Sequence, residues 1–215
     1  MSNDAKRLLM AVGVAATLWF MMFSPWTAGK INFWVTMTFS GICLGSYSVL
    51  FAEDRKDLLR IDRPVLQCLA GIALAFALWG VFWAGDKIAA MLFDFAKEGV
   101  ASVYSMKQGL PVPVIAVLLL LVIGPAEELF WRGYVQRTLS KLIKGKKGPD
   151  MALIATTAVY ALVHIWSFNF MLIMAALVAG AFWGLCYRLR PKMLPAIIVS
   201  HAVWDFLIFI AFPIQ

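Results

Sequence analysis

Seven long apolar stretches restrict the fold of this chain more than any other feature of its sequence. They cover residues 8–28, 32–51, 65–85, 112–139, 151–168, 170–187 and 193–213. A helix needs about 20 apolar residues to cross the hydrocarbon core of a bilayer. Inside lipid, a spanning segment must satisfy its own backbone hydrogen bonds, so each stretch is predicted to be a transmembrane helix. The expected fold is an all-α, polytopic bundle of about seven spans.

The composition excludes the other classes of protein. Hydrophobic residues make up 62% of the chain and charged residues only 14%, against roughly 45–50% and about 25% in soluble domains. That little charge cannot cover a water-exposed surface, and disordered and coiled-coil chains are more polar or more repetitive. The three cysteines lie in apolar stretches and form no CxxC motif, so neither a disulfide framework nor a cysteine metal site is expected.

The positions of the basic residues indicate the orientation. With the N-terminus in the cytoplasm, fourteen Lys and Arg residues lie in inner loops or at inner span ends, and Arg132 lies within a span. The outer loops hold only Lys30, Lys87, Lys97 and Lys107. This asymmetry follows the positive-inside rule. The net charge of +7 therefore orients the chain, and no nucleic-acid partner is expected. We expect a multi-pass membrane protein with its N-terminus in the cytoplasm.

One connection between spans has a helical pattern of its own. In residues 86–110, Ile88, Leu92 and Phe95 are spaced to share one helical face, and charged residues fall on another. This pattern is typical of an amphipathic helix that lies in the membrane interface. We predict such a helix on the outer surface.

Ionisable residues inside the apolar stretches are the strongest functional signal. They are Glu127, Glu128, Arg132, His164, His201 and Asp205. A charge at the centre of a membrane helix costs roughly 2.5–3.5 kcal/mol, so the four charged members cost on the order of 10 kcal/mol before pairing. Such residues mark functional sites in membrane proteins by default.

Their spacing predicts how they pair. Glu128 and Arg132 are four residues apart, as are His201 and Asp205, so each pair can meet on one helix face. Glu127 is rotated from Glu128 by about 100° and can point elsewhere.

The depths of these residues suggest one shared site. From the helical rise, His201 lies about 12 Å and His164 about 20 Å from the inner ends of their spans, and Glu127 about 22 Å from its outer end. Pro125 lacks an amide donor and should kink or loosen the helix just before the glutamates. Carbonyls freed in this way are tolerated where they line a watery cavity.

Two carboxylates and two imidazoles without a dedicated nucleophile suggest catalysis by an activated water. A glutamate would be the general base and a histidine the acid or orienting group, with polar donors for an oxyanion. The same types of side chain could instead bind a divalent metal such as zinc. That metal set would be Glu127, His164, His201 and Asp205. No HExxH, GxSxG or GxGD motif occurs, so other hydrolytic mechanisms are disfavoured.

Three short motifs carry a family resemblance. Residues 127–132 read EELFWR, which matches EExxxR; residues 160–164 read YALVH, which is similar to FxxxH; and residues 201–205 read HAVWD, which matches HxxxN/D. In this order on three helices they resemble the CPBP family. That family includes type II CAAX prenyl endopeptidases and bacterial Abi or bacteriocin-immunity proteins. The resemblance divides the chain into N-terminal helices, residues 1–111, and a catalytic core, residues 112–215.

The resemblance implies a role for each matching residue. Glu127 would activate the water with the help of His164, and Glu128 and Arg132 would hold the site together.

The third motif would stabilise the oxyanion through His201 and Asp205, or complete a metal site. Two residues depart from the usual pattern: Tyr160 replaces Phe, and Asp205 replaces the commoner Asn. An ionised Asp is a poor oxyanion donor, so Asp205 must be protonated, orient His201 or bind metal.

The resemblance therefore predicts an intramembrane endopeptidase of a bacterial cytoplasmic membrane, with a peptide or protein substrate that is membrane-anchored or not. No cofactor is certain; zinc is the candidate. Two alternatives stay open. One is a proton-coupled transporter, since buried Glu, His and Asp also form proton relays. The other is a non-catalytic bacteriocin-immunity or interaction protein that keeps the helices of the family.

Overall fold

The computed structural model describes residues 1–214 and consists of helices joined by short loops, with no strand in that range. Seven of these helices are long and apolar enough to cross a membrane, which confirms the predicted number of spans. Their bounds are Asn3–Phe23 (α1), Phe33–Phe51 (α2), Pro64–Leu92 (α4), Val112–Leu142 (α6, α7 and α8), Gly148–Ser167 (α9 and a 3₁₀ turn), Phe170–Leu189 (α10) and Pro191–Ala211 (α11 between a 3₁₀ turn and a π turn). Two short helices, α3 (Arg55–Leu58) and α5 (Ala96–Ser105), lie in the connections.

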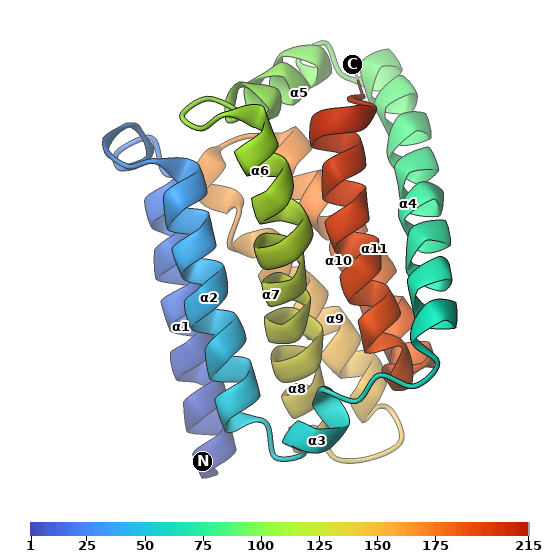
Figure 1. Ribbon diagram of the computed structural model, residues 1–215. Coiled ribbons are helices and arrows are strands. Elements are labelled where there is room, and N and C mark those ends of the chain that lie inside the picture. The colour runs from blue at the N-terminus through green and yellow to red at the C-terminus, as the bar shows by residue number, and fades with distance from the viewer. Residues whose placement is uncertain (215) are drawn as a thin grey trace.

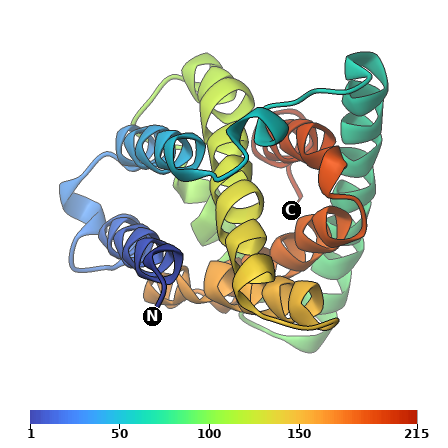
Figure 2. The same ribbon diagram turned by 90° about the horizontal axis from the view of Figure 1, so that it is seen from below.

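The spans form one bundle around the segment α6–α8 (Figure 1). Seen from below, this segment crosses the middle of the bundle, with α1 and α2 on one side and α4 at the opposite edge (Figure 2). The N-terminus and α3 lie at one end of the bundle, and α5 and the C-terminus lie at the other (Figure 1).

The structure does not contain one helix over residues 86–110, as predicted; these residues belong partly to a span and partly to a separate helix. The span α4 continues to Leu92, and α5 begins only at Ala96. Nothing in the sequence breaks the helix before Phe93, whose extended backbone ends α4 while its N–H still donates to the carbonyl of Ala89. Ile88 and Leu92 therefore belong to a span and share no helix with Phe95, so that part of the prediction was wrong. The separate helix α5 crosses the end of the bundle, as an interfacial helix would (Figure 1).

The central span is loosened around the two glutamates. It runs as α6 (Val112–Leu118), a π-helical turn (Leu119–Ile123), α7 (Gly124–Glu128), a second π-helical segment (Leu129–Gln136) and α8 (Arg137–Leu142). Wide turns of this kind are rare and often occur at functional sites. The predicted loosening before Glu127 is present, and it extends beyond Glu128 as well.

Close helix contacts hold α11 (Leu194–Phe206) against its neighbours. A Cβ atom on Gly124 would lie 2.8 Å from the Cα of Ala202, and one on Gly71 would lie 2.6 Å from the carbonyl oxygen of Ala196. These glycines let α7 and α4 approach the backbone of α11 on two sides, as small residues do between membrane helices. The contact at Gly124 places α7 beside the turn of α11 that carries His201.

Candidate active site

Glu128 is the centre of one group of polar contacts. Its side chain is fully buried, and its Oε1 accepts a hydrogen bond of 2.7 Å from Nη1 of Arg132. The same oxygen accepts a second bond of 2.7 Å from the Nδ1–H of His201. The predicted pair of residues 128 and 132 therefore forms, and it also holds the imidazole from α11.

Arg132 is bound on several sides. Its Nη2 donates to the carbonyl of Gly180 at 3.0 Å, on α10. Its Cζ lies 5.2 Å from the ring centroid of Tyr160 and 5.6 Å from that of Trp183, within the range of cation–π attraction. The ion pair and these contacts together offset the cost of a buried guanidinium.

The ring of His201 stacks on Trp183, with centroids 3.9 Å apart and planes 19° from parallel. Its Nε2 lies 3.6 Å from Oδ2 of Asp205. The predicted neighbours are therefore close, but the separation is too long for a hydrogen bond. The imidazole is fixed by Glu128 and Trp183, and Nε2 faces Asp205 without bonding to it.

Glu127 is held differently from its neighbour. Its Oε2 accepts a hydrogen bond of 3.0 Å from the hydroxyl of Tyr160, on α9 (Gly148–Leu162). It forms no ion pair within residues 1–214, and 6% of it is exposed. The hydroxyl that Tyr160 adds to the family's usual Phe thus meets the carboxylate predicted to be the base.

His164 does not hydrogen-bond to Glu127. It lies just beyond the end of α9, and its Nδ1 is 2.8 Å from the carbonyl oxygen of Tyr160. Its Nε2 accepts a hydrogen bond of 3.1 Å from the indole N–H of Trp19, on α1. Sequence reasoning missed Trp19, because one tryptophan among nine in an apolar span carries no signal of its own.

The six residues predicted for the site therefore form two groups. Arg132, Glu128, His201 and Asp205 form the first; the second contains Glu127 and His164, linked through Tyr160. The groups meet where the two glutamates adjoin and where Arg132 lies over the ring of Tyr160.

The possible metal site is not assembled. In residues 1–214, no group of three or more His, Cys, Asp and Glu side chains is placed to hold a metal ion. Both ring nitrogens of His164 are engaged by protein groups, and Nδ1 of His201 is bound to Glu128. The side chains predicted as ligands thus do not fit a metal in this arrangement.

Several buried polar atoms on the helical segments that carry the two glutamates, Arg132 and Tyr160 have no hydrogen-bond partner in the described part of the chain. Among them are Oε2 of Glu128, Nε of Arg132, Oε1 of Gln136 and Oγ1 of Thr156. Unpaired buried polar groups are costly, so this region is suited to receive a water molecule or a polar group of a ligand.

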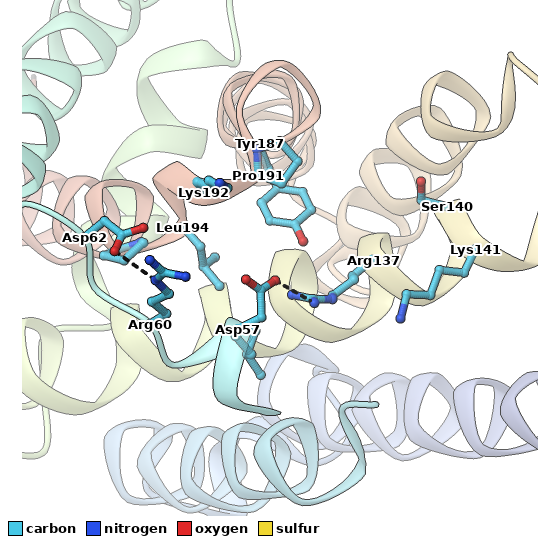
Figure 3. A pocket seen from close by; sticks show the side chains of 12 residues that line it. Asp57, Arg60, Asp62, Arg137, Ser140, Lys141, Tyr187, Pro191, Lys192 and Leu194 are labelled. Atoms are coloured by element: carbon cyan, nitrogen blue, oxygen red, sulfur yellow. Dashed lines mark hydrogen bonds and ion pairs between the residues drawn. The ribbon is translucent and has the colours of Figure 1, made fainter. Parts of the chain in front are cut away.

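A separate pocket of about 240 Å³ lies at the end of the bundle that carries the N-terminus. Asp57 and Arg137 form an ion pair of 3.0 Å at this pocket, and Arg60 and Asp62 form one of 2.9 Å (Figure 3). Neither Glu127 nor Glu128 lines it.

Helix α3 closes the bundle at that end. Leu58 is buried, and its Cδ1 lies 2.8 Å from the position of a Cβ on Gly133, in the second π-helical segment. Lys141 of α8 pairs with Glu53 and Asp54, which directly precede α3. The segment before α4 is thus held against the end of the bundle that carries the N-terminus by one buried leucine and by exposed ion pairs.

Part of the chain is similar to a known family of membrane proteases. Residues 108–207 match the family described as type II CAAX prenyl endopeptidase Rce1-like. This stretch, residues 108–207, is similar to that family and is called the Rce1-like segment. The match confirms the resemblance to CAAX proteases expected from the three motifs, and it includes all six predicted site residues. It supports a CAAX-protease-like intramembrane endopeptidase in general, and with the seven apolar helices it indicates a multi-pass membrane protein.

No curated protein and no solved structure matches the chain. Trp19 lies outside the Rce1-like segment, although it contacts His164 within it.

Proposed function

We propose that this protein is an intramembrane endopeptidase that hydrolyses a peptide bond with a water molecule activated by Glu127. The observation that carries the proposal is the different bonding of the two adjacent glutamates. Glu128 is neutralised by Arg132 and bound to His201. Within residues 1–214, Glu127 accepts a hydrogen bond only from the hydroxyl of Tyr160. A general base must be free to take a proton from its water, and of the two carboxylates Glu127 meets this condition.

The remaining groups have complementary roles in this proposal. Glu127 takes a proton from the water as its oxygen attacks the carbonyl carbon of the substrate. In this scheme His201 is an imidazolium: its Nδ1–H donates to Glu128, and its Nε2–H, which has no hydrogen-bond partner within residues 1–214, donates to the oxyanion that develops. Glu127 then passes the proton to the amide nitrogen, and the C–N bond breaks. Glu128 and Arg132 hold His201 in place throughout.

Asp205 acts on His201 in this scheme. At 3.6 Å from Nε2, its carboxylate attracts the N–H without binding it tightly. A substrate oxygen can therefore compete for that proton. No step is assigned to a metal, because the side chains predicted as ligands are not arranged to hold one.

The alternative of a proton-coupled transporter has less support. A proton path across the membrane needs polar groups over most of the bundle. Within the described residues, the buried positions of α1, α2 and α4 are apolar, glycine or serine, with no ionisable residue among them. In residues 1–214, the buried charged side chains and histidines all lie in the Rce1-like segment.

We also propose that the end of the bundle that carries the N-terminus faces the cytoplasm. The N-terminus, α3 and the loop after α8 all lie at this end (Figure 1). Most of the Lys and Arg residues belong to these segments and to residues 188–192, in keeping with the positive-inside rule.

The test is hydrolysis of quenched-fluorescence peptides, prenylated and unmodified, by the purified protein in detergent. Glu127→Gln should abolish cleavage, because an amide cannot take the proton of the water. Glu98→Gln is the matched control, since it makes the same change at an exposed position on α5. Cleavage at the unaltered rate by the Glu127 variant would rule out the mechanism. Activity in a cellular immunity assay that survives Glu127→Gln would favour the non-catalytic alternative.

A further inference from the structure

The hydrogen bond between Trp19 and His164 defines the protonation of the histidine. An indole N–H can only donate, so Nε2 of His164 must accept with its lone pair. The carbonyl of Tyr160 can only accept, so Nδ1, 2.8 Å away, must carry the proton. Both contacts select the same neutral form of the imidazole, with the hydrogen on Nδ1.

Aromatic neighbours also fix the ring in position. The ring of His164 meets Trp19 edge-on at 84°, with centroids 6.1 Å apart, and Tyr160 at 76°, with centroids 5.4 Å apart. The ring of Phe23 also packs against His164, with centroids 5.1 Å apart. Rotation of the imidazole would break two hydrogen bonds and these contacts together.

Two hydrogen bonds connect His164 to the proposed base, Glu127, through Tyr160. The last carbonyls of a helix have no partner within the helix. At the end of α9, the N–H of His164 goes to Ala161, and the side chain of His164 donates to the carbonyl of Tyr160. The hydroxyl of this same tyrosine donates to Glu127.

We propose that Trp19 is a positioning residue of the active site, because it holds His164 in the form that secures Tyr160 against Glu127. The proposal rests on the proposed function in taking Glu127 as the base. It extends the site to α1, beyond the Rce1-like segment. It also gives His164 a role different from the one implied by the resemblance: the imidazole acts through Tyr160 and does not itself assist the base.

Trp131 provides a matched control. It is fully buried like Trp19, and the two rings meet edge-on with centroids 6.1 Å apart. Its indole N–H has no hydrogen-bond partner in residues 1–214. Trp19→Phe removes the donor to His164, whereas Trp131→Phe makes the same change without removing a hydrogen bond.

The first experiment is nitrogen NMR of the full chain in lipid nanodiscs, with ¹⁵N in the imidazole rings. The chain has two histidines, and His201→Gln assigns their signals. In the unaltered protein, His164 should carry its proton on Nδ1. In Trp19→Phe, the Nε2 signal should move downfield and the second tautomer should appear, while Trp131→Phe leaves both signals in place. A proton on Nε2 in the unaltered protein, or equal shifts in the two variants, overturns the proposal.

The second experiment measures cleavage by the same variants. Trp19→Phe should lower kcat about tenfold, the effect of losing one hydrogen bond, with KM unchanged. Trp131→Phe should lower kcat less. If Glu127→Gln keeps full activity, the proposed function fails while the NMR result still decides the role of Trp19. If Glu127→Gln is inactive and Trp19→Phe matches the unaltered protein in kcat and in NMR, only the role of Trp19 is refuted.

Discussion

Glu127 and Glu128 are adjacent in the chain, yet their carboxylates bind entirely different partners. Glu128 accepts from Arg132 and His201, both at 2.7 Å, whereas Glu127 accepts from the hydroxyl of Tyr160 at 3.0 Å. The helical rotation of about 100° between neighbouring residues therefore points the two carboxylates in different directions. Glu128 is held in an ion pair, whereas Glu127 can take a proton.

Glu128→Gln should destabilise the protein much more than Glu127→Gln. Loss of the Glu128 charge leaves the guanidinium of Arg132 buried without its counter-ion, and breaking a buried ion pair in this way costs about 3–5 kcal/mol. Glu127 has no ion pair to lose within the described residues. Thermal unfolding of both variants in the same detergent measures the difference. Equal loss of stability would contradict the assigned roles.

Gly180→Ala should displace Tyr160. The added Cβ would lie 2.9 Å from Cδ1 of the tyrosine ring, and overpacking of this kind costs about 1–3 kcal/mol. Because the tyrosine hydroxyl bonds to Glu127, cleavage should fall as well. Gly80→Ala on α4 is the control, since its Cβ would have no neighbour within 4 Å. If both variants are as stable as the parent, α9 and α10 are not packed at Gly180 as described.

Leu58→Ala should undock α3. Leu58 is 4% exposed, whereas Leu59 beside it is 50% exposed. Removal of a buried leucine side chain costs about 2–5 kcal/mol, so the variant should be less stable, and the loop before α4 should be cut faster by a protease added to the solubilised protein. Leu59→Ala should change neither property. Similar cleavage rates for both variants would show that Leu58 does not hold α3.

The pKa of Asp54 should respond to Lys141. Hydrogen bonding and charge attraction from Lys141 hold the pKa of this exposed carboxyl below its ordinary value of 3.8, with a further contribution from Arg137. The contact should therefore be fully present above pH 3.8 and be lost as the pH falls through the lower, folded-state pKa. Carboxyl ¹³C NMR measures the titration. Lys141→Gln should raise the pKa of Asp54, and Lys144→Gln should not, since Lys144 forms no ion pair within residues 1–214. An unchanged titration in the Lys141 variant would exclude the pairing.

Local features of the site were predictable, because helical periodicity determines them. Residues 128 and 132 are paired in the structure as their spacing predicts, and Pro125 lies between the two π-helical segments of the central span. The boundary between α4 and α5 was not predictable from periodicity alone. The pattern at residues 86–110 continues across Phe93, but the chain turns there and the pattern does not record the turn.

The sequence by itself determined the number of spans and the set of ionisable residues within them, because the cost of burying backbone and charge in lipid depends only on which residues the chain contains. The tertiary structure decided which of those groups meet: His201 with Glu128, Tyr160 with Glu127 and His164 with Trp19. These choices depend on the rotation and depth of each helix relative to its neighbours. Close contacts such as Gly124 against Ala202, together with the wide turns around the glutamates, set that rotation, and no pattern within a single helix contains it.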